Sequence, residues 1–170
     1  MIMKNIKNKL AAVLLVGVLI SSCEKEKGPL SDIKPDVPIT VTNAVAFRPE
    51  PTVTASKSAI ISPGVIGPIT ITLSIPATSG RKITSITKVA ASTNYSAIQS
   101  TGTTGFYTTA PVAGSGTTAT FTTNLTEYVA KTGQAITASN TELTRRFYFL
   151  ITLDDNTIII PEPVRVLVID

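Results

Sequence analysis

The sequence predicts an all-β protein: an antiparallel β-sandwich with one short helix, preceded by a signal peptide. Thr, Ser, Ala, Val and Ile dominate residues 39–170, whereas Leu, Lys and Glu are scarce. Several segments alternate apolar with polar residues, which is typical of strands with one buried face. Turn residues separate these segments at fairly regular intervals, as expected for a sandwich of short strands.

A signal-peptide pattern occupies residues 1–22. Lys4, Lys7 and Lys9 precede an apolar run from Leu10 to Ile20. This run is shorter than the about 20 residues that a bilayer-spanning helix needs, and it has the length of a signal-peptide core. Without the three lysines, 12 basic residues face 11 acidic ones. The charge of the mature chain therefore gives no indication of a nucleic-acid partner.

The apolar run ends at the single cysteine of the chain. Residues 19–23 read L-I-S-S-C, which is an aliphatic residue, two small residues and a cysteine at the end of the run. This motif resembles the lipobox of bacterial lipoproteins. The resemblance implies cleavage after Ser22, a diacylglycerol on the sulfur of Cys23 and acylation of the new amine, so that several acyl chains hold the protein in a membrane. The alternative is an unmodified cysteine that follows an ordinary signal peptide.

Residues 23–38 are predicted to form a lipidated tether. Charged residues, Gly and Pro dominate the stretch from Glu24 to Pro38, and it has no hydrophobic periodicity. A charged cluster directly after the cysteine resembles the surface-export signal of Bacteroidetes lipoproteins, although Lys25 and Lys27 interrupt the acidic run. The alternative is a plain solvated linker. We expect an outer-membrane, lipid-anchored protein that faces the periplasm or the cell surface.

Residues 39–170 form the predicted sandwich domain. The expected strands cover 39–47, 52–61, 69–75, 82–91, 117–123, 145–153 and 157–169. The apolar rows that we expect to face inward are Ile69, Ile71, Leu73 and Ile75; Phe147, Phe149, Ile151 and Leu153; and Val164, Val166 and Val168.

Three other segments of the domain have their own patterns. Tyr148 falls on the face opposite the phenylalanine row, and Pro161 and Pro163 indicate an edge or a bulge in the last strand. Residues 92–116 are rich in Ser, Thr and Gly and are expected to be the least ordered part of the domain. Asn124, Glu127 and Gly133 predict a capped helix over residues 125–132 that crosses between sheets.

The end of the chain adds a family resemblance. The turn residues Asp154, Asp155 and Asn156 separate two strands, and this late hairpin resembles the last two strands of immunoglobulin and fibronectin type III domains. The resemblance implies an immunoglobulin-like arrangement. It is limited to architecture, because the cysteine pair and the core Trp of antibody domains are missing from the sequence.

The residue types present argue against an enzyme. The chain has no His, its one thiol is assigned to lipid, and no pair of carboxylates stands out as a glycosidase pair. We therefore expect no catalytic residues, no cofactor and no metal. Asp154, Asp155 and Asn156 could ligate calcium, but a hairpin turn explains the same residues. Arg145 and Arg146 could form a basic grip for a ligand, but the solvated start of a strand explains the same pair.

One group of residues is a candidate for ligand binding. Asn94, Tyr95, Phe106 and Tyr107 lie in the long polar segment, away from any expected strand. Aromatic rings with nearby amides can cover the apolar faces of sugars. The alternative interpretation places the rings over the edge of the sandwich, as part of the core.

Two functions follow from these observations. The first is a non-enzymatic, membrane-anchored lipoprotein that presents an immunoglobulin-like interaction module to an envelope protein. The second is a glycan-binding accessory lipoprotein of a nutrient-uptake system. A pilus-like subunit is a further possibility and would need the last strand as a donor strand.

Overall fold

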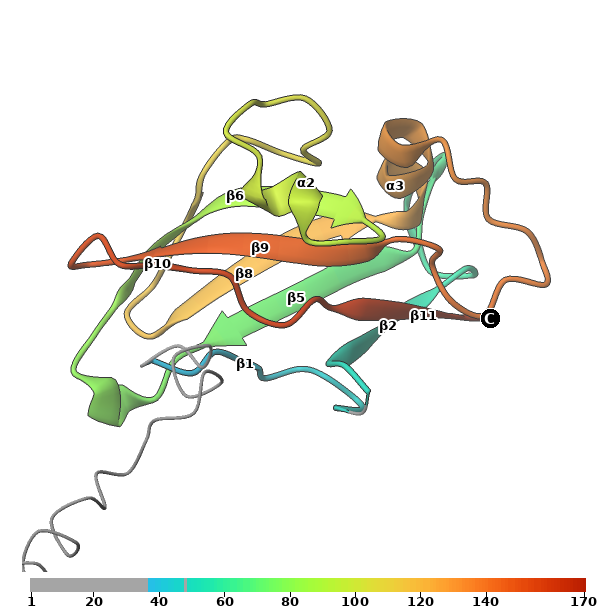
Figure 1. Ribbon diagram of the computed structural model, residues 1–170. Coiled ribbons are helices and arrows are strands. Elements are labelled where there is room, and N and C mark those ends of the chain that lie inside the picture. Colours follow the sequence, from blue (N-terminus) through green and yellow to red (C-terminus); the bar gives the residue numbers. More distant parts are fainter. Residues whose placement is uncertain (1–36, 48) are drawn as a thin grey trace, which may run out of the picture. The chain divides into compact units, whose positions relative to one another are not determined.

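The computed structural model describes residues 37–47 and 49–170 (Figure 1). This part of the chain is mostly β, with several antiparallel sheets and two α-helices, which confirms the all-β class. The predictions for residues 1–36, including the signal peptide, the lipidation of Cys23 and most of the tether, lie outside the described residues.

The described residues form the following helices and strands, given in chain order. They are β1 Thr40–Val41, β2 Thr52–Ser56, β3 Ile60–Ser62, β4 Val65–Ile66, β5 Pro68–Ser74, the 3₁₀ turn η1 Ala77–Ser79, β6 Ile83–Ser92, α2 Ser96–Gln99, β7 Val112–Ala113, β8 Thr118–Asn124, α3 Leu125–Thr132, β9 Arg146–Leu153, β10 Ile158–Ile159 and β11 Arg165–Ile169.

Two antiparallel sheets form the layers of the domain. One has the strand order β1-β5-β8 and the other the order β10-β9-β6-β7. Their inward side chains, among them the expected rows Ile69–Ile75 and Phe147–Leu153, make one buried cluster, to which Val164, Val166 and Val168 near the end of the chain also belong. Figure 1 shows β5 and β8 on one side of this core and β6 and β9 on the other. The alternation of apolar residues therefore predicted the inner faces correctly.

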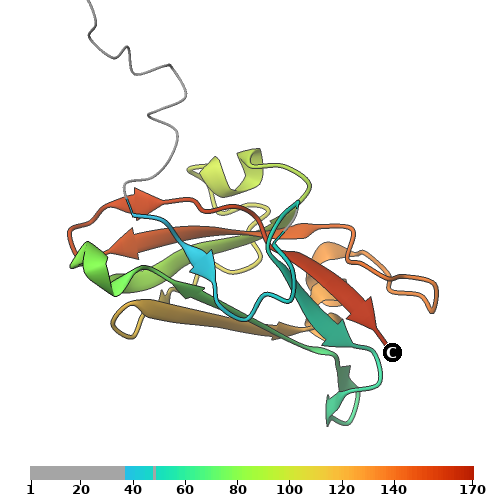
Figure 2. The same cartoon turned by 90° about the horizontal axis from the view of Figure 1, so that it is seen from below.

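The last strand pairs differently from the expectation of a purely antiparallel sandwich. β11 runs parallel to β2, with Arg165 opposite Thr52 and Ile169 opposite Ser56, and the two strands lie side by side in Figure 2. The strand that returns from the Asp154 turn to pair with β9 is the short β10. Pro161 and Pro163 separate β10 from β11, because proline cannot donate to a ladder. The predicted interruption was thus correct, but the antiparallel pairing of the final strand was wrong.

The first expected strand is much shorter than residues 39–47. Only Thr40 and Val41 pair with β5, and Phe47 is exposed. The side chain of Asn43 replaces the backbone ladder at this point: its Nδ2 donates to the Thr70 carbonyl at 2.7 Å and its Oδ1 accepts from the Thr72 amide at 2.9 Å. The side-chain amide of Asn43 bonds the backbone groups of β5 that a longer β1 would pair with. The chain therefore turns away from the sheet.

The expected helix is present, and a second helix joins it. For α3, the Asn124 Oδ1 accepts from the Glu127 amide at 2.7 Å, and Gly133 ends the helix with φ 67°. The prediction of a single helix was wrong, because α2 lies within the segment expected to be least ordered. The Asn94 Oδ1 accepts from the Ser96 amide at 3.1 Å at the start of α2, and Ile98 is fully buried.

Helix α2 covers part of the outer face of the β6–β9 sheet (Figure 1). Tyr148 points to this face, opposite Phe147 and Phe149 as the alternation predicts, but it is buried as well. It packs with Ala90 and Ile98 in a second, small cluster. Both faces of β9 therefore contribute to stability.

We predict that Gly114→Ala destabilises the domain. A Cβ at Gly114 would lie 2.0 Å from the backbone oxygen of Ile83, and the Gly114 amide already donates to the Thr84 carbonyl at 2.9 Å. Overpacking of this kind costs about 1–3 kcal/mol. The control is Gly102→Ala, where the nearest atom, the Ser100 Oγ, is 3.7 Å away and the change should stay within about 0.5 kcal/mol. Urea unfolding of both variants measures the difference in the free energy of unfolding. Equal losses of stability in the two variants would contradict the close approach of Gly114 to the backbone of Ile83.

Candidate functional site

The four residues proposed as a ligand platform do not lie on one surface. Tyr107 is only 5% exposed, and its ring packs edge-on against Phe147 at 5.3 Å and Phe121 at 6.0 Å between ring centroids. Its hydroxyl lies 2.5 Å from the Thr123 Oγ1. Tyr107 therefore has the structural role that the alternative interpretation assigned to it, and its ring offers no free face to a sugar.

The other three candidates lie outside the main core. Tyr95 is 41% exposed and stands edge-on to Tyr148, with 4.9 Å between ring centroids. The side chain of Asn94 accepts hydrogen bonds from the amide and the hydroxyl of Ser96 at the start of α2. Phe106 is half-buried, with the Lys88 Nζ 4.9 Å from its ring centroid. These contacts explain the residues without a ligand.

A different surface carries large apolar side chains that the fold does not bury. Strands β3 and β4 form a short hairpin, seen as the projecting blue-green loop in Figure 2. The exposed fractions of Ile60, Ile61 and Ile66 on this hairpin are 75%, 53% and 37%. Isolated exposed apolar residues are ordinary, but several on one projecting element indicate an interaction site. We define these three isoleucines as the hairpin surface.

A groove of about 350 Å³ adjoins the hairpin surface. Its lining is mainly apolar and includes Ile66 from β4, Leu125 and Val129 from α3, and Ile136 from the following loop. The hairpin is joined to α3 where the Ile66 amide donates to the Thr126 Oγ1 at 3.0 Å. Mostly apolar concavities with a few polar groups are the usual form of binding pockets.

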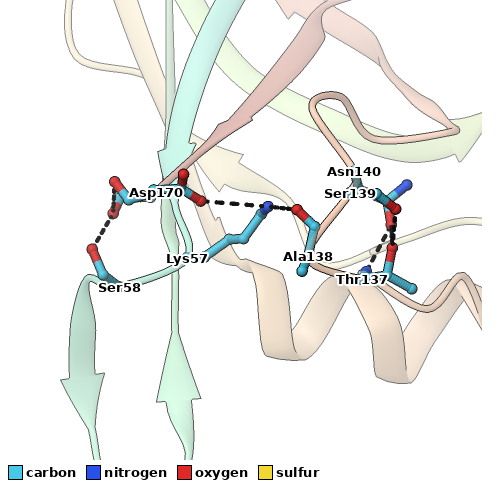
Figure 3. A network of polar contacts seen from close by, with 8 residues as sticks. Lys57, Ser58, Thr137, Ala138, Ser139, Asn140 and Asp170 are labelled. Atoms are coloured by element: carbon cyan, nitrogen blue, oxygen red, sulfur yellow. Dashed lines mark hydrogen bonds and ion pairs between the residues drawn. The ribbon is translucent and has the colours of Figure 1, made fainter.

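Polar contacts fix the rim of this groove (Figure 3). Lys57 reaches between two partners: its Nζ donates to the Ala138 carbonyl at 2.7 Å and lies 3.6 Å from the Asp170 Oδ1. In the facing loop, the Asn140 Oδ1 accepts from the Thr137 amide at 2.7 Å. The loop that carries Ile136 is thereby tied to the ends of β2 and β11.

A second groove, of about 220 Å³, lies beside β8 on another part of the surface. A chain of polar contacts closes one end of it. Glu127 accepts from the Thr123 Oγ1 and pairs with the Lys131 Nζ, both at 2.8 Å, while the Lys131 Nζ also donates to the Tyr107 carbonyl at 2.9 Å. The hydrogen bond from Lys131 is the main reason that the pKa of Glu127 is lowered. Burial raises the pKa of Tyr107 to about 12.

The remaining charged candidates are engaged within the fold. Asp154 and Asp155 belong to the expected turn, where Asn156 has φ 67°, and both carboxylates pair with Arg81. The Arg146 Nε lies 2.6 Å from the Glu50 Oε2. Among residues 37–47 and 49–170, no three acidic, Cys or His side chains gather as a metal site would require.

Sequence reasoning missed the hairpin surface. The sequence pattern places Ile60 and Ile61 at the end of an expected strand that begins at Thr52. A signal was present, because two adjacent isoleucines cannot both face the same core from one strand.

We predict that Glu127→Gln weakens the domain at neutral pH. A lowered pKa in the folded state means that the carboxylate stabilises the fold above the ordinary pKa of Glu, about 4.3, and that this contribution is lost as the pH falls through the lowered value. The stability difference between wild type and Glu127→Gln should therefore shrink from pH 7 to pH 3. Urea unfolding at several pH values measures it, with the exposed Glu162→Gln as a control that should change little. A difference that does not vary with pH would contradict this role for Glu127.

Comparisons with protein-family models, curated proteins and solved structures gave no match. Across the described residues, no helix is both long and apolar enough to span a bilayer. The candidate site is therefore defined by the geometry of this chain alone.

Proposed function

We propose that this chain is a non-enzymatic, lipid-anchored lipoprotein of the outer membrane that presents an immunoglobulin-like interaction module. The anchor is Cys23, within the lipobox pattern of residues 19–23. The binding element is the hairpin surface together with the adjoining groove. The partner is a protein of the cell envelope.

The order of the long strands supports the immunoglobulin-like part of the proposal. In immunoglobulin constant-type domains, strands A, B and E share one sheet and strands C, F and G the other. Here β1, β5 and β8 share one sheet, and β6 and β9 share the other. Val164, the residue before β11, forms an antiparallel bridge with Phe147 of β9. This order of strands in the two layers supports an immunoglobulin-like arrangement.

The observation that carries the binding proposal is the exposure of Ile60, Ile61 and Ile66 beside an apolar groove. Exposure of three large apolar side chains to water is unfavourable, and a partner that covers them gains the free energy of their burial.

The site also lies away from the point where the tether enters. Thr40 pairs with Ser74 at the end of β5, whereas the hairpin precedes Pro68 at its start. Seven extended residues separate these points, roughly 20 Å at about 3.3 Å per residue. A domain held through Cys23 can therefore present the hairpin to a partner.

The structure favours this proposal over a glycan-binding accessory. A sugar platform needs exposed rings that share a surface, and Tyr107 is in the core, where it contacts Phe121 and Phe147, whereas Tyr95 contacts Tyr148 in the separate outer cluster. The two tyrosines that would have formed such a platform belong to different packing clusters.

The anchor is tested by metabolic labelling with an alkynyl fatty acid. We expect the wild-type chain to be labelled and to sediment with membranes, and we expect Cys23→Ser to be unlabelled and released, because the acceptor sulfur is gone. Ser22→Ala keeps a small residue before the cysteine and should behave as wild type. Retention of Cys23→Ser in the membrane fraction with unchanged processing would contradict the proposal.

The binding surface is tested by photo-crosslinking in intact cells. A benzoylphenylalanine in place of Ile61 should give an adduct of one defined mass, because this position faces the partner. The matched control is Ile158, which is 62% exposed but lies on β10, away from the hairpin. Equal adduct patterns at the two positions, or none at Ile61, would refute the assignment of the hairpin surface.

A further inference from the structure

Strand β8 is a long edge strand. It closes one side of the β1-β5-β8 sheet and is seven residues long. The other edge strands of the two layers, β1, β7 and β10, have two residues each, and β2 is bridged at Thr52 to Ala46. Within the described residues, β8 is therefore the long edge that no further strand covers.

The pattern of hydrogen bonds between β5 and β8 shows which backbone groups of β8 face away from β5. The Ile75 amide donates to the Thr117 carbonyl and the Leu125 amide to the Gly67 carbonyl, both at 2.9 Å. Backbone groups in an antiparallel ladder alternate in direction, so the odd-numbered residues of β8 face β5. Thr120 and Thr122 consequently turn their N–H and C=O groups outward, where the described residues supply no backbone partner.

A groove runs beside these outward groups. The 220 Å³ groove is lined on one side by Thr120, Phe121 and Thr122 and on the other by residues 107, 108 and 110–112. That second wall is fixed to β6: the Tyr107 amide donates to the Val89 carbonyl at 2.7 Å and the Val89 amide to the Thr108 carbonyl at 3.1 Å. The unpaired edge therefore faces a preformed channel between the margins of the two sheets.

The strand itself carries none of the residues or irregularities that commonly block strand pairing. Edge strands are commonly protected by charged residues, proline or a β-bulge. The sequence of β8 is T-A-T-F-T-T-N, without charge or proline, and its register with β5 is regular. The absence of protection on a long strand indicates that the edge is used for pairing.

We propose that the outer edge of β8 binds an extended segment of another polypeptide by strand addition. The outward groups of Thr120 and Thr122 offer alternating donors and acceptors, which the backbone of an extended strand matches and a helix does not. The segment that binds at the end of the groove is uncharged, because Glu127 and Lys131 neutralise each other there and leave no charge for a partner to match. Small or β-branched side chains suit the channel beside Phe121 and Val112.

A second copy of the chain fits this edge less well than a peptide segment. Stable dimers bury about 800 Å² on each partner, and four backbone groups on two threonines offer little area of their own. A single strand from a partner gains the same ladder bonds and also fills the groove. This site is separate from the hairpin surface, so the two proposals can fail independently.

The experiment uses ¹⁵N-labelled mature chain and a capped Thr-Val-Thr-Val-Thr-Val peptide at up to about 1 mM. Main-chain bonds dominate strand addition, so a sequence-tolerant probe is appropriate. We expect the amide signals of Thr120 and Thr122 to shift in the presence of the peptide. The same peptide with N-methyl groups on alternate residues should bind at least about tenfold more weakly, and Ile61→Ser, in the hairpin surface, should bind like wild type.

Three outcomes would overturn the proposal. They are no shift at Thr120 and Thr122 at the highest peptide concentration, equal binding of the N-methylated peptide, and shifts that depend on protein concentration without peptide, which would assign the edge to a second copy. A further variant, Thr122→Lys, places a charge at the edge without altering an inward residue. It should remain folded and lose peptide binding, and unchanged binding by folded Thr122→Lys would also contradict strand addition.

Discussion

The contact of Phe121 with Phe147 and Phe149 is the interaction on which the rest of the domain depends. Phe121 lies on β8 and the other two on β9, so these rings join the two sheets, with centroids 5.6 and 5.7 Å apart. Tyr107 extends the cluster from the loop before β7, and Tyr128 extends it from α3. Burial of large aromatic side chains is the strongest packing contribution that a sequence without Trp offers. Because Tyr107 is held in this cluster, the loop that follows it is positioned opposite β8.

Features that depend on local chemistry could be predicted from the sequence. The rows Ile69–Ile75 and Phe147–Leu153 alternate with period two, and one face of each must be buried in a sheet with a single core. Helix α3 was predicted to the residue, because Asn124 and Gly133 satisfy orphan backbone groups at its two ends. The turn at Asp154 to Asn156 likewise follows from the residues themselves.

Features that depend on distant partners could not be predicted. The parallel pairing of β11 with β2 joins residues more than a hundred positions apart, and alternation does not distinguish a parallel from an antiparallel neighbour. The register of β6 with β9 shifts at two places, and alternation alone does not predict where such irregularities fall. The Asn43 side chain ends β1 through a contact with Thr70 and Thr72 that no local rule predicts. The aromatic residues of the polar segment were recognised as unusual, but only the three-dimensional packing separates the buried Tyr107 from the exposed Tyr95.

The aromatic cluster joins the two layers at the centre and leaves the outer edge of β8 without a strand partner among the described residues, and amide hydrogen exchange tests this arrangement most directly. Along β8, the amides of Ala119 and Phe121 face β5, whereas those of Thr120 and Thr122 face outward. The account predicts slow exchange for the first pair and fast exchange for the second, in alternation, together with slow exchange at Phe149 on β9. Uniform protection along β8 would contradict it, because another element would then have to cover the edge.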